Sequence, residues 1–290
     1  MNWSVEQLDI NNAFLNGDLQ ETVYMAQPEG FIQSDQPTFV CKLNKSLYGL
    51  KQAARAWLYF CSKSTWFQEL FHGFEVVRTA SGLHVSQTKY ATDLLKKTNM
   101  LHFKACATTM VYGVNLTQES GENFSDASLY RSTIGALQYL TISRPDIAFA
   151  VNKLSQYLSA PTTSHWLACK RILRYIKGTI NCGLFFQHSP QLQLTAFTDA
   201  GGSCLDDRKS TSGLCVFLGK NLIIWGARKQ KVLARSSTEA EYRALAQAAT
   251  EVIWLQSLFA EPKLSFCGIP IIWCDNTCAT SLTHNPGYHV

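Results

Sequence analysis

The stretch that decides the fold is residues 192–199, LQLTAFTD. Its apolar and polar residues alternate, which predicts a half-buried strand that ends at the carboxylate of Asp199. Further strand-like segments, a helical apolar stripe and a second apolar run follow it. The predicted elements are strands over residues 213–218, 222–225 and 231–234, a helix over 236–259 and a buried strand over 269–274. This order of elements predicts an α/β domain with a mixed sheet.

Three carboxylates in this region stand where chemistry is commonly placed. Asp199 and Asp275 each come at the end of a predicted strand, and strand ends are where α/β proteins place functional side chains. Taken alone, such an aspartate is more often a turn or cap residue. The helix adds Glu241, because its apolar stripe extends toward Glu241 and not toward Glu239. The stripe consists of Leu245, Ala248, Val252, Leu255 and Phe259.

An acid on the inward face of a helix is costly unless it has a partner, and a metal ion is one such partner. The alternative is a capping box with Thr238 as the N-cap, although Ser236 supplies an equivalent box nearby. If Asp199, Glu241 and Asp275 converge, they can hold two Mg²⁺ or Mn²⁺ ions, which prefer oxygen ligands. The predicted chemistry is phosphodiester cleavage, in which one ion activates water and the other stabilises the leaving oxygen.

The composition is that of a globular protein with a mild positive charge. Of 290 residues, 46% are hydrophobic and 16% are charged, and the net charge of +5 is compatible with a polyanionic partner without requiring one. The ten cysteines lack zinc spacing, so we expect free thiols in a reducing compartment. The N-terminus has no signal-peptide pattern, and no apolar run is long enough to span a membrane. These features predict an intracellular location, in the cytoplasm or the nucleus.

The middle of the chain is predicted to be helical. The expected helices cover residues 89–99, 125–140, 146–158 and 164–177. On the last of them Lys170, Arg174 and Lys177 are spaced so that they share one face. Such a face can contact a phosphate backbone, and the alternative is an ordinary solvated surface.

The last third of the chain contains several short motifs in a fixed order. They are Asp199-Ala200, residues 207–213 (DRKSTSG), residues 228–230 (RKQ), residues 236–242 (SSTEAEY), Cys274-Asp275-Asn276 and His284-Asn285-Pro286. Together they resemble the RNase H region of copia-type retrotransposon Pol polyproteins. The resemblance implies a Mg²⁺-dependent or Mn²⁺-dependent ribonuclease acting on RNA–DNA hybrids, with Asp199, Glu241 and Asp275 as its catalytic metal ligands.

The first part of the chain resembles the reverse transcriptase of the same polyproteins. Residues 7–15 (QLDINNAFL) resemble its first catalytic motif, and residues 47–57 (LYGLKQAARAW) resemble the motif that contacts template and nucleotide. The roles carried over are Asp9 as a catalytic metal ligand, Phe14 as a steric gate against a ribose 2′-hydroxyl, and Lys51 and Gln52 as contacts to nucleotide or template. The implied partners are an RNA template, a dNTP and an RNA–DNA hybrid. The integrase and protease of a full polyprotein are absent from this chain.

The resemblance is interrupted after Trp57. The family has a Tyr-x-Asp-Asp hairpin between this motif and a later strand that residues 70–76 resemble, and here only a few residues separate the two. Without the hairpin carboxylates one of two metal ions is poorly held, so we expect no DNA synthesis. The family also continues to a final acidic residue past the point where this sequence stops, so weak or no RNA cleavage is expected.

The expected fold class is α/β: an α+β palm remnant with a helical connection, followed by an RNase H-like α/β domain with a mixed sheet. The predicted domains are a fingers/palm remnant over residues 1–110 with an internal deletion after Trp57, a thumb-like helical connection over 111–190, and a C-terminally truncated RNase H-like domain over 191–290. Three functions stay open. They are a reverse transcriptase–RNase H fragment, a surviving Mg²⁺-dependent RNase H, and a non-catalytic nucleic-acid-binding remnant.

Overall fold

The computed structural model describes residues 18–28, 35–36, 38–45, 74–113, 116–201, 204–261, 263 and 266–284. The chain forms two compact units, Met1–His72 and Gly73–Val290. Helices and mixed sheets together give the α/β class that the sequence predicts. The helical segment and the predicted nuclease region both lie within the second unit.

In the first unit two strands form an antiparallel ribbon. β1 (Asp18–Ala26) pairs with β2 (Val40–Lys45), and Val23 lies opposite Leu43. The side chains of β2 are exposed or half-buried along its whole length. A two-stranded ribbon of this kind has little core of its own.

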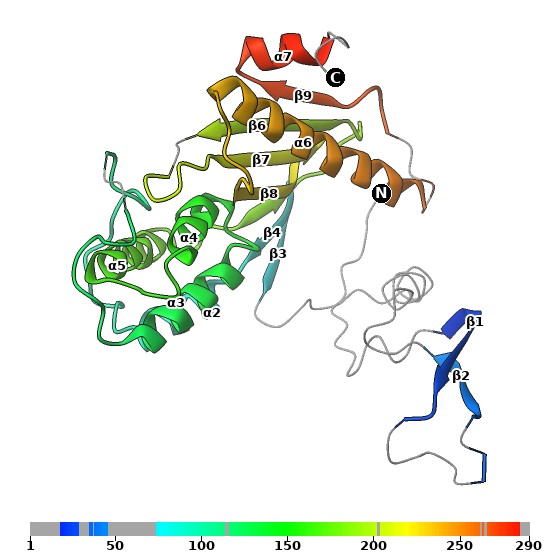
Figure 1. The fold of residues 1–290 in the computed structure, drawn as a ribbon, viewed down its shortest axis with the longest axis horizontal. Coiled ribbons are helices and arrows are strands. Elements are labelled where there is room, and N and C mark those ends of the chain that lie inside the picture. The colour runs from blue at the N-terminus through cyan, green and yellow to red at the C-terminus, as the bar shows by residue number, and fades with distance from the viewer. Residues whose placement is uncertain are drawn as a thin grey trace. The chain divides into compact units, whose positions relative to one another are not determined.

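The first half of the second unit is helical (Figure 1). Its elements are α2 (Thr88–Lys97), α3 (Ala127–Leu140), the short 3-10 turn η2 (Pro145–Ile147), α4 (Ala148–Ser155) and α5 (Thr163–Gly178). The predicted helices are thus confirmed, with ends displaced by a few residues and the third one divided between η2 and α4. Tyr130, Ile134, Ile172 and Leu173 are fully buried in the core that these helices share.

A three-stranded antiparallel sheet joins the two ends of the helical segment. It consists of β3 (Glu75–Thr79), β4 (Gly82–Ser86) and β5 (Leu184–Phe186), with β4 in the middle. Leu83 lies opposite Phe186, far away in the sequence. At Gly82 a Cβ atom would collide with the carbonyl oxygen of Phe186, so the close approach of the two strands requires glycine.

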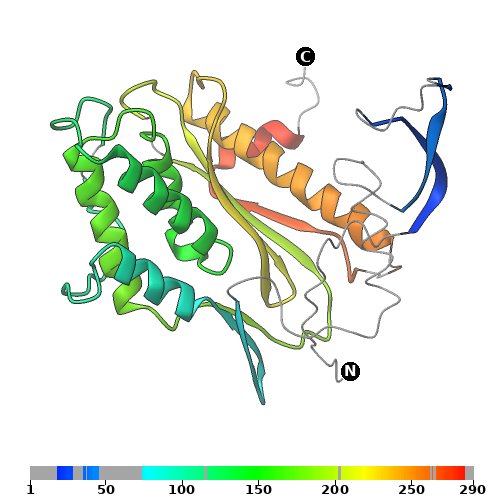
Figure 2. The same cartoon turned by 90° about the horizontal axis from the view of Figure 1, so that it is seen from below.

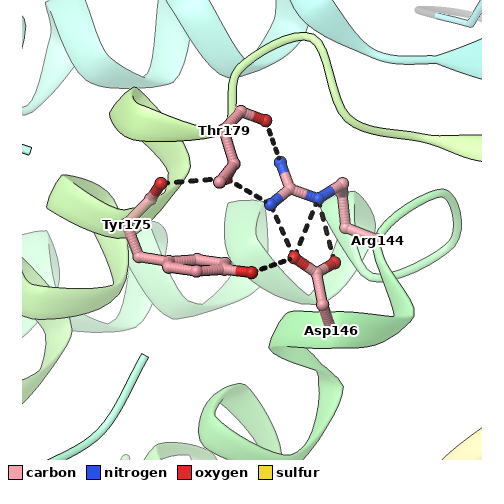
Figure 3. Close-up of polar contacts among 4 residues, drawn as sticks. All are labelled: Arg144, Asp146, Tyr175 and Thr179. Carbon is pink, nitrogen blue, oxygen red and sulfur yellow. Dashed lines mark hydrogen bonds and ion pairs between the residues drawn. The ribbon is translucent and has the colours of Figure 1, made fainter. Parts of the chain in front are cut away.

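An ion pair between the buried Arg144 and the partly exposed Asp146 lies just before α4 and is hydrogen-bonded to the end of α5 (Figure 3). Arg144 is 2% exposed, and its guanidinium donates to both oxygens of Asp146, over 2.9 Å from Nε and 2.7 Å from Nη2. It also donates to the carbonyl and hydroxyl oxygens of Thr179, and the Tyr175 hydroxyl donates to Asp146. Burial disfavours the ionised Asp146, but the hydrogen bond and charge of Arg144 outweigh it and hold the pKa of Asp146 below its ordinary value. Losing Asp146 would leave the buried charge of Arg144 without its ion-pair partner.

Helix α5 begins at a capping box that uses a histidine. The Thr162 hydroxyl accepts from the His165 N–H, and Nδ1 of His165 accepts from the Thr162 N–H over 3.0 Å. Nε2 of His165 lies 3.0 Å from the carbonyl oxygen of Thr117, and the ring stacks on Tyr157 with centroids 3.9 Å apart. Burial lowers the pKa of His165. The neutral ring with its proton on Nε2 satisfies both contacts at once.

The second half of the unit is a four-stranded sheet. Its strands are β6 (Leu194–Gly201), β7 (Thr211–Leu218), β8 (Asn221–Lys229) and β9 (Ile271–Cys274), arranged in the order β8-β7-β6-β9. The first three strands form an antiparallel meander, whereas β9 is parallel to β6. The mixed sheet predicted from the sequence is therefore present.

Two sequence predictions in this region are wrong. Residues 231–234 are not a strand, because β8 lies at the edge of the sheet and the chain turns back there to begin α6 (Ser237–Ala260). The strand expected over residues 269–274 starts only at Ile271 and is not buried on both faces. It also lies at an edge, and Trp273 is 56% exposed.

Helix α6 runs along one face of the four-stranded sheet, as Figures 1 and 2 show. Ala248, Val252 and Leu255 pack there against Ala196 and other apolar residues of β6 and β7. After β9 the chain forms α7 (Thr277–His284), which contacts α6. None of the helices in the described part of the chain is both long and apolar enough to cross a bilayer.

The helical half and the sheet half are connected by side chains of β8. The indole Nε1 of Trp225 donates to the carbonyl oxygen of Thr141 over 2.9 Å, and Lys229 Nζ donates to the Gln156 side chain over 3.0 Å. Helix α4 packs against β8 at the same place. These contacts hold the two halves of the second unit as one body.

Candidate metal centre

Strand β6 brings Asp199 to the edge of the candidate site. Alternation along β6 buries Ala196 and Thr198 and leaves Asp199 exposed. Strand β9 ends at Cys274, opposite Thr198, so it does not reach as far as Ala200. The Ala200 N–H instead donates to Oε2 of Glu241 over 3.1 Å.

Helix α6 directs Glu241 to this point. The helix is capped by Ser236, whose hydroxyl accepts from the Glu239 N–H, and Glu239 itself accepts from the Arg235 N–H and from Arg243. The carboxylate of Glu239 is therefore occupied by hydrogen bonds at the protein surface, whereas Glu241 is only 7% exposed. The prediction that Glu241 and not Glu239 faces inward is confirmed.

The buried stripe of α6 differs in two positions from the predicted stripe. Ala244 is buried where Leu245 was expected, and both Leu245 and Phe259 are half-buried. The small side chain of Ala244 lets the helix lie close to the sheet, one turn away from Glu241.

Three side chains with ligand atoms lie together at the end of β9. These are Glu241, Cys274 and Asp275, whose ligand atoms all lie within 4.8 Å of one another. Asp199 is outside this group of three, although it interacts with the Glu241 carboxyl. Two of the three predicted carboxylates, Glu241 and Asp275, belong to this group, and Cys274 was not predicted.

The electrostatics of the cluster favour a cation. Burial raises the pKa of Glu241, and the negative charges of Asp199 and Asp275 raise it further, while the hydrogen bond from the Ala200 N–H opposes the shift. Within the described ranges no lysine or arginine forms a salt bridge with any of these three acids. A buried carboxylate beside two others, without a basic partner, is the setting in which a divalent ion supplies the missing charge.

Cys274 lies close to Glu241, with 4.0 Å between Sγ and Oε2. Burial and then the neighbouring carboxylates raise the pKa of its thiol, so the thiolate is disfavoured. The ligands that remain are carboxylate oxygens, which suit hard cations such as Mg²⁺ and Mn²⁺ better than zinc.

The basic residues predicted to contact phosphate lie on one side of α5. Arg174 Nε donates to the carbonyl oxygen of Lys104 over 2.7 Å, and Lys177 Nζ donates to that of Phe103 over 2.6 Å. Lys170 lies over the Trp166 ring, 5.6 Å from its centroid. Arg174 and Lys177 therefore also fix the segment that follows α2, and phosphate contact stays a prediction for all three residues.

The remaining predicted site residues belong to the first unit. Asp9, Phe14, Lys51 and Gln52 lie outside the described residues. Their roles as metal ligand, steric gate and nucleotide or template contacts stay predictions.

Comparison with known proteins identifies the family. Residues 1–65 match the family model described as reverse transcriptase (RNA-dependent DNA polymerase). Over 99% of its length the chain is 40% identical to the retrovirus-related Pol polyprotein from transposon RE2 of Arabidopsis thaliana. It is also 34% identical, over 98% of its length, to the corresponding polyprotein from transposon TNT 1-94 of Nicotiana tabacum. The chain belongs to the copia-type retrotransposon Pol polyproteins.

This Pol chain spans only 24% of the RE2 polyprotein and 27% of the TNT 1-94 polyprotein. The activities, substrates and partners of the whole polyproteins are therefore not transferred to it directly. No solved structure matches the Pol chain.

Proposed function

We propose that this Pol chain carries a divalent-metal-dependent RNase H site, formed by Asp199, Glu241 and Asp275, that cuts the RNA strand of RNA–DNA hybrids. The observation that supports it is the buried Glu241 beside two further acids, with no basic partner among the described residues. Asp199, Glu241 and Asp275 would hold Mg²⁺ or Mn²⁺, which would supply an activated water and charge stabilisation for the leaving oxygen of the phosphodiester.

The residues of the chain have separate tasks in this proposal. Glu241 supplies the buried ligand, and the Ala200 N–H orients its carboxyl. Asp275 follows the last strand, and the side chain of Asp199 lies on the exposed side of β6, where a substrate backbone has access. The fixed helix and strands hold these oxygens, so that the ions need not order them on binding.

The test is cleavage of an RNA–DNA hybrid labelled on its RNA strand, with Mg²⁺ or Mn²⁺. We expect weak cleavage that EDTA stops and that Asp199→Asn reduces to background. The matched control is Asp93→Asn, an equivalent change at an exposed helix surface. No cleavage by the unmodified chain, or equal cleavage by the Asp199→Asn variant, would contradict the proposal.

We further propose that the chain does not synthesise DNA. The match to the RE2 polyprotein extends over 347 residues, more than the 290 of this chain, so the relative has residues that face gaps here. This supports an internal deletion, which the sequence places after Trp57 at the Tyr-x-Asp-Asp hairpin. Primer extension on an RNA template with dNTPs tests the proposal: we expect no product, and clear extension would refute it.

A second candidate function is non-catalytic binding of nucleic acid through α5. It is favoured by Lys170, Arg171, Arg174 and Lys177, because no described carboxylate lies within salt-bridge distance of them. Unpaired cations in a row attract a phosphate backbone and release its counterions. Steeply salt-dependent binding without cleavage would favour this function over the nuclease.

A further inference from the structure

A cavity of about 500 Å³ lies between α5 and the segment that follows α2. This is within the range of about 300–1,000 Å³ that is typical of ligand pockets. Its walls are mainly apolar and include the side chains of Met100, Phe103, Met110, Leu116 and Leu167. The cavity lies outside the carboxylate cluster, and the proposed nuclease does not use it.

The charged groups around the cavity are all basic. Lys170, Arg171 and Arg174 line it, and none of its described lining residues is acidic. Arg171 donates from Nη2 to the Thr108 hydroxyl over 2.6 Å, yet its Nε is buried without a hydrogen-bond partner. A buried donor without an acceptor is costly, and no acidic group among the described lining residues neutralises this guanidinium.

The cations extend beyond the cavity along the helix. Arg174 and Lys177 follow Lys170 at intervals of four and three residues, so they form a row on successive turns. One small anion would contact only one or two of these cations, whereas a chain of phosphates would contact all of them. The ligand class that matches a cationic row beside an apolar cavity is a polyanion with flat apolar groups.

A single strand of nucleic acid has this chemistry. Proteins bind such strands with a positive groove for the backbone and with apolar or aromatic side chains for the bases. A duplex keeps its bases stacked inside, so only an unpaired base can enter a cavity. Phe103, 50% exposed, offers its ring at the wall.

We propose that the cavity beside α5 accepts an unpaired base of single-stranded nucleic acid, while Lys170, Arg171, Arg174 and Lys177 hold the adjoining phosphates. This inference deepens the nucleic-acid-binding function proposed above and does not depend on the carboxylate cluster. Because the site contacts base and phosphate and not sugar, DNA and RNA strands are one ligand class for it.

The experiment measures binding of a fluorescein-labelled oligothymidylate to the full chain by anisotropy. EDTA and the Glu241→Gln substitution prevent metal-dependent binding or cleavage at the carboxylate cluster, so that the anisotropy reports only the cavity and the cations of α5. We expect binding that weakens steeply with salt, and at least several-fold weaker binding of a duplex and of an abasic strand of equal length. Failure of the nuclease would therefore leave this result unchanged.

Two variants locate the binding. Ala168→Phe fills the cavity and leaves every charge in place. It should therefore weaken binding of the thymidylate strand several-fold and leave binding of the abasic strand unchanged. Lys170→Gln should weaken the binding of both strands. Lys220→Gln removes an equal charge from the exposed β7–β8 turn and should leave the binding of both strands unchanged. If Ala168→Phe does not fold, as judged by circular dichroism, Leu167→Asp at a 65% exposed wall position replaces it. Its added negative charge should weaken binding of both strands, and binding of the thymidylate strand more than that of the abasic strand.

A site-specific readout comes from Cys106. Its backbone N–H donates to the Arg174 carbonyl oxygen. A hydrogen bond from the Thr108 backbone, together with the charges of Arg171 and Arg174, lowers the pKa of its thiol. Bound oligothymidylate should slow the alkylation of Cys106 and leave the alkylation rate of Cys278 on α7 unchanged. Peptide mass spectrometry measures both rates.

Three results would overturn the proposal. They are no binding of the single strand, equal binding of the thymidylate and abasic strands, and a Leu167→Asp or Ala168→Phe variant that binds like the original. Equal competition by poly-glutamate would also overturn it, because the site would then recognise negative charge alone.

Discussion

At Glu241 a carboxyl group is buried beside Asp199 and Asp275, so folding itself makes its ionised form less favourable. Burial is the largest contribution, and the two neighbouring charges add to it. A carboxyl whose pKa is raised in the folded state binds its proton more tightly there than in the unfolded chain. The metal-free protein therefore loses stability as the pH rises through the raised pKa of Glu241.

Replacement of this residue should show the effect directly. In EDTA near pH 7, we expect Glu241→Gln to raise the melting temperature by roughly 2–4 °C, as about 1 kcal/mol does in a domain of this size. The gain should shrink as the pH falls through the raised pKa, and vanish below the ordinary value of about 4.3, where glutamate is protonated in both states. Thermal denaturation over a pH series measures it.

The same series with Mg²⁺ or Mn²⁺ provides the control. The ions should stabilise the original chain and have little effect on the variant, because only the former offers the buried ligand. A variant that is less stable than the original at neutral pH in EDTA would show that Glu241 has a stabilising partner instead.

At the scale of elements, the start of α5 depends on a neutral histidine. Nδ1 of His165 accepts from the Thr162 N–H, and a protonated ring cannot accept there. Burial lowers the pKa of His165 in the folded chain. A histidine with a lowered pKa contributes stability above its ordinary value of about 6.5, and this contribution is lost as the pH falls through the lowered value.

We therefore expect unfolding by urea to become easier from about pH 6.5 downward, with α5 losing its cap. His165→Asn keeps a side-chain acceptor and removes the titration, so the pH dependence of its unfolding should be flatter in this range. The free energy of unfolding, measured between pH 8 and pH 5 for the original chain and for the variant, tests both expectations. If the free energy of unfolding depends equally on pH in the two chains, groups other than His165 cause the loss of stability.

The helices were predictable from the sequence because their apolar residues recur at helical spacing. Glu241 was predictable for the same reason, since the stripe of α6 fixes which acid faces the sheet. The position of a strand within its sheet was not predictable. Residues 231–234 alternate like a strand but have no partner beyond β8, and β5 is a three-residue strand defined only by its pairing with distant β4.

Cys274 shows the same limit at the site. Its thiol joins the cluster because the parallel register of β6 and β9 places it opposite Thr198. Register is a property of the folded sheet, and an apolar run such as IIWC does not contain it.

At the scale of the whole molecule, the helical and sheet halves of Gly73–Val290 form one compact unit. Trp225 and Lys229 of β8 hydrogen-bond to groups of the helical half. A fragment of residues 73–290 should therefore unfold in a single calorimetric transition. A fragment of residues 191–290 should be much less stable, because it exposes the surface of β8 that α4 covers.

The control for this comparison is Trp225→Phe in the 73–290 fragment. It removes the hydrogen bond to the Thr141 carbonyl together with part of the ring packing, and it should cost at least about 1 kcal/mol, measured by urea denaturation. Two separate transitions in the 73–290 fragment would show that the halves fold independently.

The parallel pairing of β6 with β9 also determines when the carboxylate cluster can form during synthesis. Asp199 leaves the ribosome first, and β7, β8 and the whole of α6 must follow before β9 carries Asp275 to its place beside β6. Such a long-range pairing forms late, since its loop-closure entropy is lost before its contacts are gained. A nascent chain thus has no complete cluster until the last strand has docked, and translation that stops within α6 releases a protein that cannot assemble it.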